Sequence, residues 1–301
     1  MLNLTQKTIR SVELKESLFK KLLVLSGLVV VFLMSGLFLT LFTKSLLSIS
    51  HSGFSFLTSS TWDPVKETYG ALPFLLGTLI TSILALLISL PFSAALSIFI
   101  GEYLKEGFWT TVLNSSIDLL AGIPSVIFGF WGLFVVVPII RKIELFLGII
   151  PHGVGILSSS IILALMIIPY SASISREVIS LVPQDIKEAA LSLGATPFEM
   201  VTKVILPYAK SGIFAGFLMS FGRAISETMA VTMLIGNSNK IPSSIFSPAN
   251  TLSSVIANEF AEAAEAEYLS SLIELALVLF FVTAFFSLVG RFIIKKWMVN
   301  A

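Results

Sequence analysis

Two oppositely charged side chains lie within an otherwise apolar stretch of this chain. Arg223 and Glu227 are four residues apart within residues 212–235, and on a helix this spacing places both side chains on one face. A guanidinium can hold a phosphate-like oxyanion through paired hydrogen bonds, and a nearby carboxylate can orient or release that anion. Together with the hydroxyls of Ser226 and Thr228, the pair is a candidate anion pathway. The alternative is an ion pair that only stabilises a helix bundle.

A long polar segment, residues 176–211, interrupts the apolar sequence and is called the knob segment below. Pro183 suits the start of a short helix, and Gly194 suits its end, where a left-handed backbone is common. Thr196 and Glu199 have the spacing of a capping box at the start of a second helix. Two helices around a glycine turn would form a compact knob that can insert into a groove on another protein.

The composition indicates a membrane protein. The chain has 301 residues, of which 55% are hydrophobic and 12% charged, and its mean hydropathy is +0.96. Soluble domains carry about twice that charge. A stretch of about 20 apolar residues can span a bilayer core as a helix. The sequence predicts six such spans: 22–43, 72–97, 116–139, 154–175, 212–235 and 271–294.

These spans divide the chain into a charged N-terminal tail at 1–21, a first transmembrane helix at 22–43 and a five-helix transmembrane domain at 72–294. That domain contains the knob segment. The first span is too long for the core of a signal peptide and has no small-residue cleavage site, so we expect a permanent anchor. The fifth span carries small residues at four-residue intervals, which allow close helix packing: Gly212, Gly216, Ser220, Ala224 and Thr228.

Several kinds of chemistry have no support in the sequence. There is no cysteine, which excludes disulfides and thiolate chemistry. The two histidines fall in separate predicted loops, so we expect neither a metal site nor any other cofactor. A net charge of +1 gives no sign of nucleic-acid binding. No nucleotide-binding phosphate loop and no catalytic cluster is found, so we do not expect an enzyme.

Basic residues predict the orientation. With the N-terminus inside, 13 of the 19 Lys and Arg residues lie on the inner side, five lie outside, and Arg223 lies within a span. Cytoplasmic segments are enriched in Lys and Arg. Both termini and the knob segment are therefore expected in the cytoplasm.

An acidic run occupies the third expected external loop, residues 236–270. Its glutamates have helical spacing in part, and they are Glu259, Glu262, Glu265 and Glu267. The simpler interpretation is a solvated helix face. The alternative is a docking surface for an external partner.

The knob segment resembles a known docking loop. Glu188-Ala189-Ala190 is followed after three residues by Gly194, and after nine more by Val204-Ile205-Leu206-Pro207. This pattern is similar to the EAA loop of ATP-binding-cassette (ABC) importer permeases, with Val204 where the family has Ile. The resemblance implies an all-α polytopic membrane protein with six transmembrane helices and the type I importer permease fold. It also implies that Glu188, Ala189, Ala190, Gly194, Leu206 and Pro207 contact an ATPase. We expect Pro207 to end the second helix of the knob.

A second resemblance concerns the cargo. The sequence from Gly222 to Val231, GRAISETMAV, is similar to the fifth-helix signature of phosphate importer permeases of the PstC type, with Ser226 in place of the usual glycine. The resemblance extends over about 56–270. It implies that Arg223 and Glu227 line the substrate pathway.

The family resemblance also implies partners and a location. It implies a sister permease (PstA-like), a cytoplasmic ATPase dimer (PstB-like) that hydrolyses ATP, and an extracytoplasmic phosphate-binding protein (PstS-like). Membrane lipids would surround the spans, in the cell inner membrane. Two alternatives stay open: an ABC importer permease for another oxyanion, and an ion-driven secondary transporter or membrane enzyme.

Overall fold

The computed structural model describes residues 2–104 and 107–299, and the side chains of residues 15–104 and 107–296. Within these residues the regular structure is helical, apart from one isolated β-bridge between Asp63 and Thr68. Six helical stretches are long and apolar enough to cross a membrane: Lys15–Ser52, Leu72–Tyr103, Ser125–Phe146, Ile156–Ser180, Pro197–Ser226 and Ala266–Lys296. The predicted fold class, an all-helical protein with six spans, is confirmed.

Three helices form the centre of the bundle: α3 (Leu72–Ile98), α7 (Ile156–Ser180) and α10 (Leu206–Ser226). In the most apolar part of α7, 67% of the residues are buried, against 28% in the corresponding parts of α3 and α10. The predicted close packing of small residues occurs between α10 and α7. A Cβ atom at Gly212 would lie 2.5 Å from Val178, and one at Gly216 would lie 3.2 Å from Ile174.

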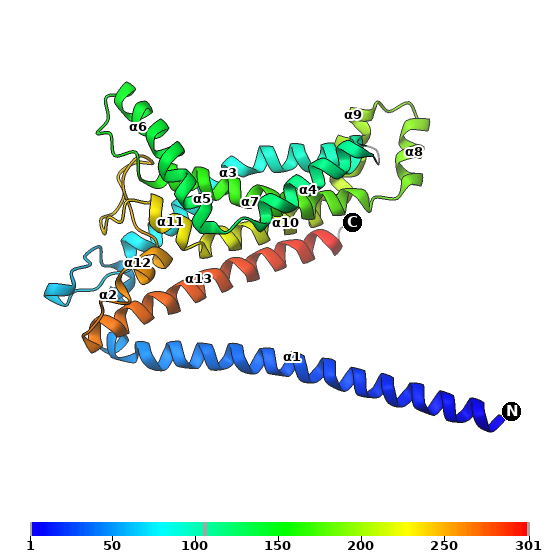
Figure 1. Cartoon of the computed structure of the whole chain (residues 1–301), viewed down its shortest axis with the longest axis horizontal. Helices are drawn as coiled ribbons and strands as arrows, with labels where there is room; N and C mark the ends of the chain where they lie inside the picture. Colours follow the sequence, from blue (N-terminus) through cyan, green and yellow to red (C-terminus); the bar gives the residue numbers. More distant parts are fainter. Residues whose placement is uncertain (1, 105–106, 300–301) are drawn as a thin grey trace.

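The first and last helices pair with each other. A single helix, α1 (Leu2–Ser52), includes the described part of the expected tail, residues 2–21, and the expected first span, while residue 1 lies outside the described residues. Helix α13 (Ala266–Val299) lies beside the C-terminal part of α1. The Ser48 and Ser271 hydroxyls are 3.0 Å apart, and the Ser270 hydroxyl donates to the Lys44 carbonyl at 2.8 Å. Figure 1 shows that α1 diverges from the bundle towards its N-terminus.

The two ends of the bundle differ in composition. One end, called the knob end, carries α8 (Gln184–Ser192) and α9 (Pro197–Met200), and the N-terminal end of α1 and the C-terminal end of α13 lie on the same side (Figure 1). The opposite end, called the loop end, carries α2 (Ser55–Thr58), the 3₁₀ turn η1 (Pro64–Lys66) and α12 (Leu252–Glu259). An even number of spans places the two ends of the chain on the same side of the bundle, as the predicted topology requires.

The expected continuous third span at 116–139 is wrong. The chain instead forms α4 (Phe108–Gly122), then α5 (Ser125–Trp131), the π-helical turn η3 (Gly132–Val136) and α6 (Val137–Phe146). The break falls at Ile123 and Pro124, where Ile123 has an extended ψ of 127°. A proline disfavours helical geometry at the residue before it and cannot donate a backbone hydrogen bond.

The expected fifth span at 212–235 is also interrupted. Helix α10 ends at Ser226, Glu227 has an extended ψ of 129°, and a short helix α11 (Met229–Leu234) follows. At its other end α10 continues directly from α9 through the π-helical turn η4 (Val201–Ile205). The helix therefore begins in the knob segment and stops between Arg223 and Glu227.

Candidate functional site

Arg223 lies in the last turn of α10 and faces Tyr170 of α7. Its Nη1 atom donates to the Tyr170 hydroxyl at 3.3 Å, and the guanidinium carbon lies 4.6 Å from the centre of the Tyr170 ring. The Arg223 Nε atom is buried and has no hydrogen-bond partner within the described part of the chain. A buried donor without an acceptor is costly. Arg223 therefore has donor capacity left for an oxygen-rich ligand.

Tyr170 is a site residue that the sequence argument missed. It follows Pro169 inside α7 and is partly exposed. A tyrosine hydroxyl in an apolar span needs a hydrogen-bond partner. The presence of a tyrosine within the predicted span 154–175 was therefore the sequence signal that could have identified it. Here the ring supports the guanidinium by a cation–π contact, while the hydroxyl accepts one of its hydrogen bonds. Tyr170 thus holds Arg223 in one orientation.

The prediction that Arg223 and Glu227 share a helix face is wrong. Because α10 ends at Ser226, Glu227 leaves the helical path. No ion pair joins the two side chains among the described residues. Instead a Glu227 carboxylate oxygen lies 3.5 Å from the backbone nitrogen of Ala230, in the first turn of α11. A carboxylate is favoured at a helix N-terminus, where backbone N–H groups lack partners.

Hydroxyl groups accompany the helix break. The exposed Ser226 side chain donates to the Gly222 carbonyl at 3.0 Å, and Thr228 donates to the Ser226 carbonyl at 3.3 Å. Such side-chain bonds offer the backbone an alternative to continued helix. The Ser253 hydroxyl, in the first turn of α12, donates to the Glu227 carbonyl at 2.9 Å. The four predicted pathway residues are thus gathered at a polar break between α10 and α11 that α12 helps to fix.

The knob segment folds as a helix, a glycine turn and a second helix, as predicted. Helix α8 follows Pro183, and Gly194 has a left-handed φ of +86°. Thr196 and Glu199 form the expected capping box at the start of α9. The segment lies at the knob end, whereas Arg223 lies near the opposite end of α10. The two candidate sites are therefore separated by most of one span.

Pro207 does not end the second knob helix, which corrects the prediction. It lies in the first turn of α10, and α9, η4 and α10 are continuous. In η4 the Leu206 N–H bonds to the Val201 carbonyl, which widens the turn ahead of the proline. A π-type turn shifts the hydrogen-bond register, so the missing N–H of a proline is accommodated without a break.

The knob presents apolar side chains to its surroundings. Glu188, Ala189 and Gly194 are exposed, and next to them Leu193 and Phe198 are 90% and 71% exposed. Large exposed apolar patches, unlike single exposed apolar residues, are typical of protein–protein interaction sites. On the inner side of the knob, Ala190 and Leu206 pack against a buried cluster that joins α7, α9 and η4.

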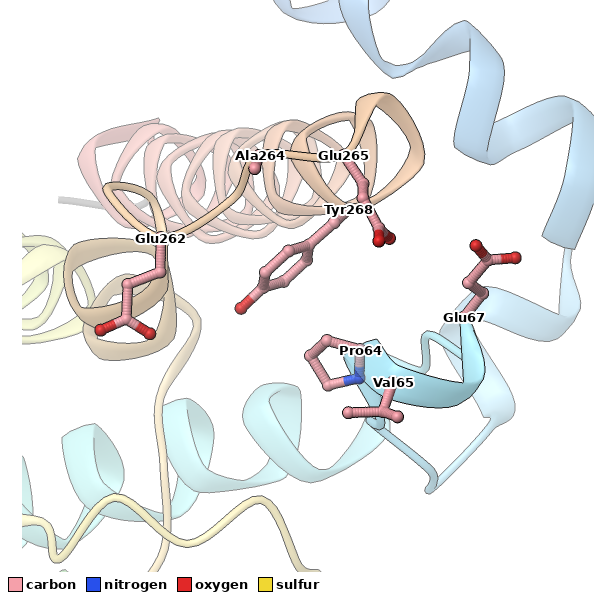
Figure 2. Close-up of a pocket in the computed structure, with 7 residues that line it drawn as sticks. All are labelled: Pro64, Val65, Glu67, Glu262, Ala264, Glu265 and Tyr268. Atoms are coloured by element: carbon pink, nitrogen blue, oxygen red, sulfur yellow. The ribbon is translucent and has the colours of Figure 1, made fainter.

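The loop end holds an acidic pocket. Figure 2 shows Glu67 and Glu265 on facing segments around Tyr268, with Pro64, Val65, Glu262 and Ala264 completing the lining. The prediction of a single solvated helix face for the acidic run is wrong. Glu259 ends α12, Glu262 and Glu265 lie in the connection that follows, and Glu267 lies in α13.

Glu259 is a structural acceptor rather than a solvated charge. Trp62 Nε1 donates to it at 2.8 Å and the Tyr268 hydroxyl at 2.7 Å. Trp62 also packs edge-on against Tyr69, and Tyr69 stacks on Tyr268. Burial, followed by the negative field of Glu265 and other nearby glutamates, raises the pKa of Tyr69 to about 12. One aromatic cluster therefore joins the segment 62–69, which precedes α3, to the start of α13.

Comparison with known proteins agrees with this architecture. The chain is 42% identical to the phosphate transport system permease protein PstC of Haemophilus influenzae, over 93% of each chain. It is 40% identical to the protein of the same name from Mesorhizobium japonicum, over 96% of this chain and 93% of that one. The probable PstC protein of Methanocaldococcus jannaschii is 35% identical, over 96% of this chain and 98% of the relative.

Solved structures share the fold at low sequence identity. A chain of the MetNI methionine ABC transporter in an inward-facing conformation matches with a TM-score of 0.56 and 16% identity, over 79% of this chain and 99% of that chain. Residues 93–298 match the family described as binding-protein-dependent transport system inner membrane component. With six apolar spans, close relatives along nearly its whole length and this match, the chain belongs to that family of multi-pass membrane proteins.

Proposed function

We propose that this chain is the permease subunit of an ATP-driven phosphate importer and forms the translocation pathway with a sister permease of the PstA type. The observation that carries the proposal is the similarity over nearly the full length to permeases named for phosphate transport. The importer fold and the oxyanion chemistry available at Arg223 support it independently. A permease has no catalytic centre of its own, so ATP hydrolysis falls to a partner.

Arg223 is the residue proposed to meet phosphate. Its guanidinium is held against Tyr170 and retains an unpartnered, buried Nε donor. The hydroxyls of Ser226 and Thr228 lie at the adjoining helix break and can exchange their backbone acceptors for phosphate oxygens. A fork of N–H donors matches an oxyanion better than an ammonium does.

Glu227 is proposed to promote release. Its carboxylate lies at the same break without a basic partner among the described residues, so it repels an anion that stays near Arg223. Two like charges in a space of low dielectric interact strongly. The arrangement favours an anion that binds briefly and moves on.

The knob segment is proposed to dock on a cytoplasmic ATPase dimer of the PstB type. The exposed face with Glu188, Ala189 and Gly194 would be the contact, with Leu193 and Phe198 as apolar anchors. Ala190, Leu206 and Pro207 would connect that contact to α10. Closure of the ATPase dimer around ATP would then move α8 and the helices packed against it.

The remaining partners follow from orientation. The excess of basic residues on the knob side supports cytoplasmic termini. A phosphate-binding protein of the PstS type would then deliver its cargo at the loop end, and lipids of the cell inner membrane would surround the spans.

The proposal is tested by reconstitution. The chain is assembled in liposomes with its sister permease, ATPase and phosphate-binding protein, and uptake of labelled phosphate is measured with ATP inside. We expect ATP-dependent uptake that excess unlabelled phosphate abolishes and excess sulfate does not. Uptake that sulfate or another oxyanion suppresses more strongly would reassign the cargo. Uptake driven by an ion gradient without ATP would reject the importer class.

A further inference from the structure

The knob segment contains a buried basic side chain that the docking proposal does not use. Lys187 is the one buried residue of α8, although it directly precedes the exposed Glu188. Its Nζ atom lies 2.6 Å from a carboxylate oxygen of Glu102, and the side chains are only 9% and 12% exposed. A lysine is rarely buried unless it is paired. The pair therefore ties the outer knob helix to a specific place in the bundle.

Glu102 belongs to the knob end of α3. It lies in the π-helical turn η2 (Phe99–Tyr103), which continues α3 without a break. At the neighbouring Gly101 an added Cβ would lie 3.2 Å from the Arg176 carbonyl and 3.0 Å from Ile179, both in α7. The π-turn is thus pressed against α7 while it directs Glu102 towards α8. Single π-turns inside helices occur often at functional positions.

Helix α3 connects this ion pair with the opposite end of the molecule. Along its length, Ser93 accepts a hydrogen bond from Ser171 of α7 at 2.6 Å. At its loop end, the Thr78 hydroxyl accepts from the backbone nitrogen of Leu252, the first residue of α12, at 3.0 Å. The adjacent Ser253 donates to the Glu227 carbonyl at 2.9 Å. A displacement of α3 along its axis would thus reach the break beside Arg223 through α12.

We propose that the Lys187–Glu102 pair is the positioning contact that passes movement of α8 to α3. The inference rests on the proposed docking of an ATPase on α8. Without this pair, α8 is held by its short connections to α7 and α9 and by the apolar packing of Ala190 against a cluster with residues of α9 and η4. Apolar contacts are non-directional and allow the helix to slide. A short, shielded ion pair fixes one point of α8 to one point of α3.

A purely stabilising role makes a different prediction. Removing one partner of a buried pair leaves an uncompensated charge, whereas replacing both by apolar residues is often neutral or stabilising. If the pair only stabilises the fold, an apolar pair should preserve transport. If the pair transmits movement, an apolar pair should preserve assembly and still lose transport, while a reversed ion pair should keep it.

The experiment uses the complete reconstituted complex and measures two quantities, phosphate imported and ATP hydrolysed. The variants are Lys187→Met, Glu102→Gln, the apolar double Lys187→Met/Glu102→Met and the reversed double Lys187→Glu/Glu102→Lys. We expect phosphate moved per ATP to fall about ten-fold in both single variants and in the apolar double, within the usual range of coupling effects. The reversed double should recover at least about half of the parental ratio.

Lys66→Met is the matched control, since it breaks an exposed pair with Asp63 at the loop end. It should leave the ratio unchanged. A parental ratio in either single variant, full recovery in the apolar double, or no recovery in a reversed double that assembles would overturn the proposal. Failure of all four variants to assemble would assign the pair to folding and also overturn it. The proposed function fails differently: the parental complex itself would then not import phosphate or would not retain the ATPase.

Discussion

At the scale of single residues, the candidate pathway depends on one guanidinium with an aromatic support. Tyr170 holds Arg223 by its ring and its hydroxyl, but it leaves Nε without an acceptor. This combination fixes the orientation of the side chain without neutralising it. A carboxylate in the same place would satisfy Arg223 and compete with an anionic cargo.

Arg223→Gln is expected to lower phosphate uptake by about 10- to 100-fold, because hydrogen bonds to a charged group contribute roughly 1.5–3 kcal/mol. Arg223→Lys should be intermediate, since it keeps the charge and loses the fork. Tyr170→Phe retains the ring and removes one hydrogen bond, so its effect should be less than about ten-fold. Labelled-phosphate uptake is compared at equal amounts of assembled complex. Full activity of Arg223→Gln would remove Arg223 from the pathway.

Glu227→Gln should slow transport by a different route. Loss of the negative charge lets phosphate remain at Arg223, so the maximum uptake rate should fall about ten-fold, equivalent to about 1.4 kcal/mol, while ATPase binding stays normal. Because the two residues are not paired in the structure, the double variant Arg223→Gln/Glu227→Gln should be no better than Arg223→Gln alone. Recovery of uptake in the double variant would show that the charges act as an ion pair after all.

The sequence identified these residues but not their relation to each other. Residue type and spacing singled out Arg223 and Glu227, because charges are expensive in an apolar span. The prediction that they share a helix face required an unbroken helix, but α10 ends at Ser226, and this break separates the two side chains. Tyr170 could not be assigned, since its role depends on how α7 packs against α10.

At the scale of elements, capping residues predicted where helices begin and end more accurately than hydropathy did. Gly194 and the Thr196–Glu199 capping box were predictable because both depend on short-range backbone geometry. The break near Pro124 was missed because apolar residues continue across it, and the break at Glu227 because apolar stretches flank the three polar residues 226–228 on both sides. The second break also depends on Ser253, a contact from a distant part of the chain.

Gly194→Val tests the knob as a docking element. A β-branched residue at φ +86° is strained, by roughly 1–2 kcal/mol, so the turn between α8 and α9 should be displaced. We expect loss of ATPase copurification and of phosphate uptake, with normal amounts of the chain in the membrane. Gly148→Val is the matched control: Gly148 has φ +70° and open space around it, as Gly194 does, but it lies beyond α6. Equal ATPase retention in the two variants would argue against docking at the knob.

At the scale of the whole molecule, the six spans form a bundle in which α7 is enclosed and α1 is peripheral. In the most apolar part of α1 no residue is buried, compared with 67% in that of α7. The number of spans was predictable from hydropathy because each needs only length and apolar composition. Which spans pack against each other was not predictable, because this depends on contacts between distant residues, such as the contact of Gly212 with Val178.

The orientation of this bundle is the last prediction. Both termini and the knob lie at one end, and the basic residues concentrate on that side, so the positive-inside rule predicts that this end is cytoplasmic. Reporter fusions after residues 190 and 301 should give fluorescence from a green fluorescent protein and no alkaline phosphatase activity. Fusions after residues 60 and 250 should give the reverse, since they lie at the loop end. A fully reversed pattern would place the knob outside, where no ATP is available, and would exclude both the ATPase contact and the coupling proposed for Lys187 and Glu102.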